Sequence, residues 1–169
     1  MHIRVISRFV FLIFLLTVAA IPSDARPNQA PVSSEYAIGS IIVKTTDKKL
    51  LFVRGKNDIV TYSIAVGRQG RNWTGTAKIS RKVLNPAWAP PPLIRKNNPR
   101  LPALIKPGPK NPLGAAVLVL GDGTYGIHGT NRPETIGTNA SFGCFRMYNA
   151  DILALFKQVR IGTPVYVQY

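Results

Sequence analysis

Reactive side chains are scarce in this chain. Its 169 residues contain one cysteine, Cys144, and two histidines, His2 and His128. A single thiol excludes an internal disulfide, so the fold must be held together by its core, which roughly 140 residues are enough to build. Cys144 and His128 together supply fewer ligands than structural or catalytic zinc sites use. We therefore expect neither a metal nor a cofactor.

Long apolar runs are also scarce, and the one long example covers residues 9–21. This run is shorter than the about 20 apolar residues that span a membrane. Arg4 and Arg8 precede it, and small residues follow it up to Ala25, which is the pattern of a secretory signal peptide. We expect residues 1–25 to be such a peptide, cleaved after Ala25; the alternative is a retained membrane anchor.

Acidic side chains are the third scarce class. Seven Asp and Glu stand against 22 Lys and Arg, which gives a formal net charge of +15. Cleavage removes two arginines and one aspartate and leaves +14. Such a charge indicates an anionic environment, and export favours cell-wall polymers or anionic lipid over nucleic acid. The alternative is that scattered charges only keep the protein soluble. We expect a monomer that does not bind nucleic acid.

The apolar pattern after the signal predicts a mainly β domain over residues 40–169, preceded by a linker over residues 26–39. Short β-branched runs alternate with Gly, Asn and Asp turns, which is typical of successive hairpins. The expected strands are residues 41–43, 50–53, 59–66, 77–80, 115–120, 125–128 and 163–169. One amphipathic helix is predicted by apolar residues at helical spacing, Ile152, Leu155, Phe156 and Val159, with Asn149 as its cap.

Residues 85–112 differ from the rest, because nine of the fourteen prolines lie there. Proline fixes φ and removes a backbone donor, so we expect neither a central strand nor a helix in this segment. Apolar residues such as Trp88 and Leu101 make a disordered tail the weaker alternative. We expect an ordered loop that forms one wall of a cleft.

Cys144 and His128 are sixteen positions apart, each beside a glycine. A thiol is mostly protonated at neutral pH and needs a base, for which imidazole is the best suited side chain. Taken alone, a buried structural cysteine and a packed histidine are the more common outcome. Gly143 permits a tight turn whose backbone N–H groups could bind an oxyanion, and Gly129 lets a carbonyl approach the imidazole. The pattern favours acyl transfer through a thioester.

Several motifs occur in a characteristic order. Ile127-His128-Gly129-Thr130 is followed, after a loop, by Ser141-Phe142-Gly143-Cys144-Phe145-Arg146-Met147. Further motifs are Thr74-Gly75-Thr76, Asn85-Pro86-Ala87-Trp88, Asn111-Pro112-Leu113-Gly114 and Gly162-Thr163-Pro164-Val165. With these motifs the chain resembles L,D-transpeptidase catalytic domains of the YkuD type over nearly all of residues 40–169.

The resemblance implies a β-sandwich-like domain that acts on peptidoglycan stem peptides in the bacterial periplasm or cell wall. Cys144 would attack the amide after the third stem residue and release D-Ala, and His128 would be its base. The thioester would pass to an amine of a neighbouring stem, giving 3-3 crosslinks. Gly143 and Cys144 would bind the oxyanion through their backbone, and Ser141 and Arg146 would shape the pocket.

Phe142 departs from the motif, in which histidine usually stands two residues before the cysteine. Phenylalanine cannot hydrogen-bond a substrate carboxylate, and a drier site raises the thiol pKa. A rise of about one pKa unit costs only about threefold in rate, because the rarer thiolate is also the stronger nucleophile. We therefore expect an active enzyme with an altered preference for donor or acceptor.

Two alternatives to the crosslinking reaction stay open. The same thioester can be passed to water, as in an L,D-carboxypeptidase, or to an amine of an envelope protein. A chain that kept the fold without the chemistry would instead be a basic module that binds the cell wall. Acylation of Cys144 by a carbapenem separates the enzyme from the binding module.

Overall fold

The computed structural model describes residues 35–169. The expected signal peptide and most of the expected linker lie outside these residues. The strands are β1 (Ile41–Lys44), β2 (Lys49–Gly55), β3 (Asp58–Ser63), β4 (Val66–Gly67), β5 (Gly75–Leu84), β6 (Ala116–Leu120), β7 (Tyr125–His128), β8 (Asn139–Ser141), β9 (Phe145–Arg146) and β10 (Pro164–Gln168). The helices are α1 (Pro92–Asn97), the 3₁₀ helix η2 (Pro133–Thr135) and α2 (Asn149–Gln158). None of the helices within residues 35–169 has the length and apolar character to span a membrane.

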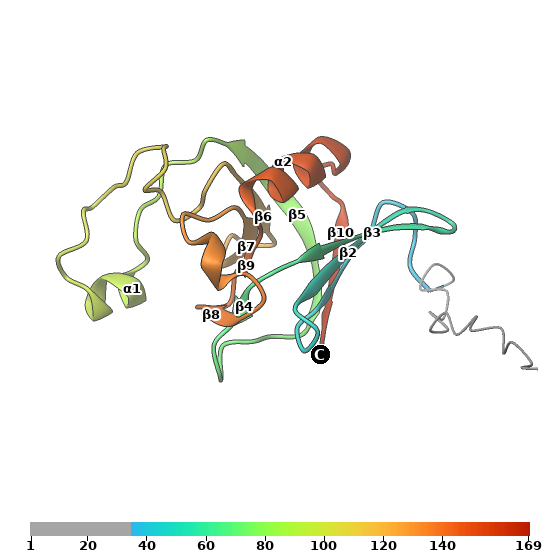
Figure 1. Cartoon of the computed structure of the whole chain (residues 1–169), viewed down its shortest axis with the longest axis horizontal. Coiled ribbons are helices and arrows are strands. Elements are labelled where there is room, and N and C mark those ends of the chain that lie inside the picture. The colour runs from blue at the N-terminus through green and yellow to red at the C-terminus, as the bar shows by residue number, and fades with distance from the viewer. Residues whose placement is uncertain (1–34) are drawn as a thin grey trace, which may run out of the picture. The chain divides into compact units, whose positions relative to one another are not determined.

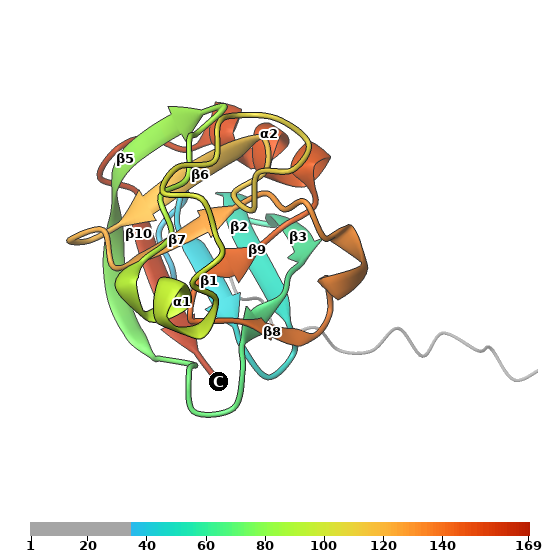
Figure 2. The same ribbon diagram turned by 90° about the vertical axis from the view of Figure 1, so that its left-hand side faces the viewer.

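Eight strands form one sheet in the order β3-β2-β1-β10-β5-β6-β7-β9, and β4 pairs separately with β8. The sheet curls (Figures 1 and 2), with α2 packed on β6 and β7. Its two ends meet through Ala65, two residues after β3, which exchanges backbone hydrogen bonds of 2.9 and 3.0 Å with Arg146 of β9. The predicted mainly β fold with one C-terminal amphipathic helix is confirmed, and the sandwich-like layers are parts of one curled sheet.

The core lies inside the curl. Ile41 and Val43 of β1 point into it, together with Ile152 and Leu155 of α2, and all four are fully buried. Ile42 points to the other face of the sheet and is buried there in a smaller cluster. Burial on both faces explains why the first predicted strand is a continuous apolar run rather than an alternating one.

The proline-rich segment, residues 85–112, leaves the sheet after β5 and carries α1 near its far end (Figure 1). Asn111 ties the start of this segment to its end. Its buried Nδ2 donates to the carbonyls of Pro86 (2.8 Å) and Ile105 (3.2 Å). The prediction of no helix here is wrong, because Pro92 occupies the first turn of α1, where a missing N–H costs little. No residue of α1 is buried. The expectation that this segment walls a cleft stays a prediction.

Candidate active site

Parallel pairing of β7 with β9 brings the predicted catalytic residues together. His128 ends β7 and stands opposite Arg146 in register, and its carbonyl accepts the Met147 N–H at 2.8 Å. Cys144 directly precedes β9 and is two positions from Arg146. Residues that pair in register on neighbouring strands lie side by side. Arg146 and His128 are therefore neighbours across the two strands, and Cys144 lies just before the start of β9.

The surroundings of His128 favour a neutral imidazole. The side chain is 5% exposed, and its Nδ1 lies 2.6 Å from the carbonyl oxygen of Gly129. A carbonyl can only accept, so Nδ1 carries the proton and Nε2 keeps its lone pair. Burial and, to a smaller extent, the charge of Arg146 lower the pKa of His128 to about 4, against the opposing effect of the Gly129 hydrogen bond. The predicted approach of a carbonyl to the imidazole is made by Gly129 itself.

Cys144 is a free, partly buried thiol. Burial raises the pKa of the thiol, while a backbone hydrogen bond from Gly126 and the charge of Arg146 act in the opposite direction. The thiol pKa is thus raised, which is the direction expected from the sequence. Both pKa directions favour the neutral forms of the imidazole and of the thiol.

Ser141 holds the turn that presents the sulfur. Its buried hydroxyl donates to the Cys144 carbonyl (2.6 Å) and accepts the Gly143 N–H (3.0 Å). The Gly143 amide is thus already bonded within the turn. The expectation that Gly143 donates to an oxyanion is not supported by this geometry, because the bonded N–H is directed at Ser141. Of the two expected oxyanion donors, only the backbone N–H of Cys144 stays a prediction.

An aromatic pair holds the same turn from outside. Gly143 has a φ of +122°, and a Cβ at this position would lie 2.6 Å from the ring of Tyr125. Trp73 stacks on Tyr125 with ring centroids 4.9 Å apart, and its Nε1–H donates to the Gly143 carbonyl at 3.1 Å. The prediction of a tight glycine turn is confirmed. The sequence analysis missed Trp73 and Tyr125, although Trp73 adjoins one of the quoted motifs.

Asn149 ties the histidine loop to the start of α2. Its Oδ1 accepts the N–H groups of Ala115 and Thr130, both at 3.1 Å, and its Nδ2 donates to the Thr130 carbonyl at 3.0 Å. The prediction that Asn149 caps the helix is wrong: Tyr148 is the N-cap residue and makes no side-chain cap. The Asn149 carboxamide instead occupies the space where Gly129 would carry a side chain. Gly129 is therefore required by packing next to the base.

Phe142 lies under two arginines. The Arg68 guanidinium is 4.7 Å from the ring centroid of Phe142 and that of Arg71 is 5.9 Å away. Arg146 is the third guanidinium of the site, and burial, Arg132 and Arg68 lower its pKa. The predicted residues Ser141, Phe142, Gly143 and Arg146 thus flank Cys144 in one segment, and Arg68 and Arg71, which no sequence pattern predicts, lie over Phe142.

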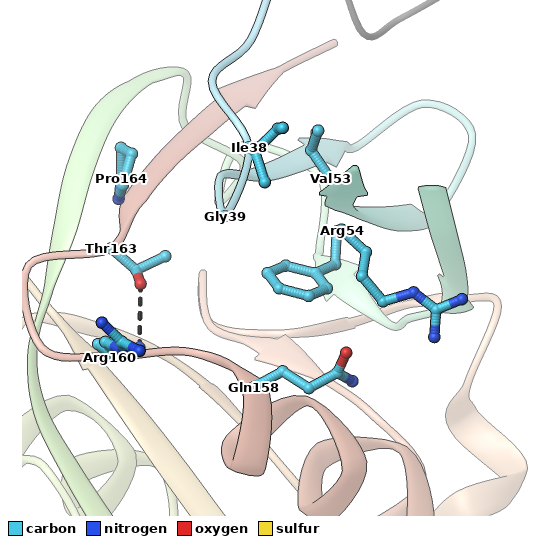
Figure 3. Close-up of a pocket in the computed structure, with 9 residues that line it drawn as sticks. Ile38, Gly39, Val53, Arg54, Gln158, Arg160, Thr163 and Pro164 are labelled. Atoms are coloured by element: carbon cyan, nitrogen blue, oxygen red, sulfur yellow. Dashed lines mark hydrogen bonds between the residues drawn. The ribbon is translucent and has the colours of Figure 1, made fainter. Parts of the chain in front are cut away.

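An open pocket of about 560 Å³ lies elsewhere in the fold (Figure 3). It is bordered by the end of β2, the last residue of α2 and the loop before β10, where the Arg160 N–H donates to the Thr163 hydroxyl at 3.1 Å. No cysteine or histidine lines it. The pocket is therefore separate from the group around Cys144.

Residues 39–167 match the L,D-transpeptidase catalytic domain family. The chain belongs to this family. It is 36% identical over 134 residues to the probable L,D-transpeptidase YbiS of Escherichia coli, covering 74% of this chain and 43% of YbiS. It is 35% identical over 134 residues to the putative L,D-transpeptidase YqjB of Bacillus subtilis, covering 75% of this chain and 69% of YqjB. The chain thus spans less than half the length of YbiS.

Solved structures of L,D-transpeptidases share the fold. L,D-transpeptidase 3 from Mycobacterium tuberculosis matches with a TM-score of 0.61 at 13% identity, over 77% of this chain and 60% of that chain. The catalytic domain of the Enterococcus faecium enzyme, acylated by ertapenem, matches with a TM-score of 0.57 at 19% identity, over 76% of this chain and 95% of that chain. The curled β domain is therefore the fold of L,D-transpeptidase catalytic domains.

In this L,D-transpeptidase family member, the pKa directions predict how Cys144 responds to pH. Alkylation by iodoacetamide requires thiolate, and burial raises the thiol pKa. We expect the alkylation rate to climb about tenfold per pH unit from about pH 6 to 8, because the thiolate fraction does so below the pKa. A thiolate–imidazolium pair would instead give a plateau in this range, and observing one would contradict the assignment of a neutral pair.

Proposed function

We propose that the protein is an exported peptidoglycan L,D-transpeptidase that forms 3-3 crosslinks. The observation that carries the proposal is the pairing of β7 with β9, which sets His128 opposite Arg146, two residues after Cys144, while Nδ1 of the imidazole is bonded to the Gly129 carbonyl. Membership of the family supports peptidoglycan stem peptides as the substrate class. The expected signal peptide supports action in the periplasm or cell wall.

The reaction proceeds in two acyl transfers. In the first, the Cys144 sulfur bonds to the carbonyl carbon after the third stem residue, and Nε2 of His128 takes the thiol proton. The tetrahedral intermediate collapses, the C–N bond breaks, and the proton goes to the amine of the leaving D-Ala. In the second, an amine of a neighbouring stem attacks the thioester and gives a proton to His128. The C–S bond breaks, and the proton returns to the sulfur.

Muropeptide analysis of cells that express the wild type or Cys144→Ala tests this proposal. We expect new crosslinks between third-position residues with the wild type and none with Cys144→Ala, because the variant lacks the nucleophile. Shortened stems would point to transfer to water, and peptides of an envelope protein on the stems would point to a protein acceptor. Identical muropeptide profiles for wild type and variant would contradict the proposal.

A further inference from the structure

The loop that follows β4 joins the nucleophile turn along its whole length. Gly67 pairs with Ser141, the Arg68 N–H donates to the Ser141 carbonyl at 3.0 Å, and the Arg68 Nε donates to the Ala140 carbonyl at 3.3 Å. Arg71 closes the loop through its N–H, which donates to the Arg68 carbonyl at 2.8 Å. The two arginines therefore keep a fixed relation to the turn that carries Cys144.

Phe142 organises these arginines. Its side chain lies two positions before Cys144, and both guanidinium groups lie over its ring, at 4.7 Å for Arg68 and 5.9 Å for Arg71. A guanidinium over an aromatic face is held in orientation while its remaining N–H groups can bind an acceptor. In Arg68, whose Nε donates to the Ala140 carbonyl, these are the Nη groups. The aromatic residue at this position thus acts as a platform for positive charge two residues before Cys144 in the sequence.

The positive charge at this site is not balanced by acidic residues. Four arginines gather around Phe142 and Arg146, the residues two before and two after Cys144: Arg68, Arg71, Arg132 and Arg146 itself. Within residues 35–169 only Arg132 pairs with an acid there, Glu134 at 3.1 Å. Gathered cations repel one another unless an anion joins them. The arrangement suits a substrate carboxylate, which a guanidinium binds through paired N–H groups.

The chemistry of the reaction says which carboxylate this is. The amine that leaves in the first transfer belongs to D-Ala, so its neighbouring carbon carries a carboxylate. By microscopic reversibility, the amine that attacks the thioester follows the path by which the first amine left. A site that holds the carboxylate of the leaving group therefore also favours an acceptor with a carboxylate on the carbon next to its amine.

We propose that Arg68 and Arg71, held on the ring of Phe142, bind the carboxylate beside the amine that enters the thioester. The protein then selects amino-acid-type acceptors over isolated amines such as the side chain of a protein lysine. Arg68 and Arg71 determine specificity by touching the acceptor, and Phe142 is a positioning residue. This inference rests on the proposed transpeptidase function and identifies its acceptor.

Competition between two acceptors tests the inference. The purified full chain is given a disaccharide-tetrapeptide donor together with equal amounts of D-methionine and D-methioninamide, which differ only in the carboxylate. The ratio of the two products depends on the second transfer alone and not on how fast the thioester forms. We expect the Arg68→Gln/Arg71→Gln variant to lower the ratio of carboxylate to amide product by at least about tenfold, the scale of a charge-assisted hydrogen bond.

Further variants sharpen the result. Phe142→Leu keeps an apolar side chain but has no aromatic face, so we expect the ratio to fall by a factor of about two to five. Arg81→Gln, alone or with Lys78→Gln to match the two charges lost in the double variant, removes exposed cations on β5 and serves as the charge control, for which we expect an unchanged ratio. All of these substitutions lie outside the catalytic pair, and circular dichroism verifies that each variant is folded.

The failure of this inference can be told apart from the failure of the proposed function. A wild type that forms no thioester with the donor would contradict the proposed function and, with it, this inference. A wild type that forms the thioester and gives the same product ratio as Arg68→Gln/Arg71→Gln would contradict the inference alone. An equal fall of the ratio in Arg81→Gln, alone or with Lys78→Gln, would also overturn it, because net charge would then explain the preference.

Discussion

Replacing His128 with asparagine is expected to lower the rate of Cys144 acylation at neutral pH by about 10²–10⁴-fold, the usual contribution of a general base. The effect is large because the thiol is neutral at rest: burial raises its pKa, and no preformed thiolate substitutes for the missing base. Stopped-flow measurement of acylation by a carbapenem, with intact mass to verify the adduct on Cys144, gives this rate.

The pH dependence distinguishes loss of the base from loss of structure. The deficit of His128→Asn should shrink as pH rises, because thiolate then forms without help from the imidazole. In the wild type the imidazole stays unprotonated down to about pH 4, so protonation of His128 does not limit the rate above about pH 5. A wild-type rate for His128→Asn at pH 7, or a deficit that is the same at every pH, would contradict the role of general base.

Gly129→Ala is expected to destabilise the protein by about 1–3 kcal/mol, the usual cost of placing extra atoms in a filled site. The added methyl group would overlap the Asn149 carboxamide and lie 3.0 Å from the backbone nitrogen of Ala115. Because the Gly129 carbonyl orients His128, the acylation rate should fall as well. Urea denaturation gives the loss of unfolding free energy. Gly55→Ala is the control, because its added Cβ meets Asp58 at an ordinary 3.4 Å.

A double-mutant cycle tests whether the Asn149 carboxamide is the cause. Asn149→Ala alone loses the hydrogen bonds to Ala115 and Thr130 and should destabilise the protein. Combined with Gly129→Ala, it also removes the steric overlap. The loss of unfolding free energy in the double variant should therefore be smaller than the sum of the two single losses by about 0.5 kcal/mol or more. Strict additivity would mean that the methyl group is accommodated elsewhere.

The sequence was sufficient to predict most of the sheet and to single out Cys144 and His128 as candidates, for physical reasons that apply to particular residues. A lone thiol and a lone domain histidine leave few candidates for covalent chemistry. Gly143 predicts a turn, and its φ of +122° is one that residues with a side chain rarely adopt. The predicted strand over residues 125–128 agrees with β7. The helix spacing of Ile152 and Leu155 correctly identified the buried face of α2.

Other features lie beyond the reach of a sequence pattern. Strands β4 and β9 have two residues each, too few to show an alternation. The sequence predicts a cap at Asn149 because a cap bonds to residues only a few positions away. The actual partners of Asn149, Ala115 and Thr130, lie 34 and 19 residues away. The contact of Arg68 with Phe142 likewise joins two segments that only the parallel pairing of β4 and β8 brings together.

One measurement tests the central claim, that Cys144 forms a thioester with a stem peptide. The purified protein is mixed with a disaccharide-tetrapeptide, quenched in acid and analysed by intact mass and peptide mapping. The account predicts an adduct that equals the donor minus D-Ala, located on Cys144, with free D-Ala in solution. Cys144→Ala is expected to show neither product. An adduct on another residue, or release of D-Ala by Cys144→Ala, would contradict the account.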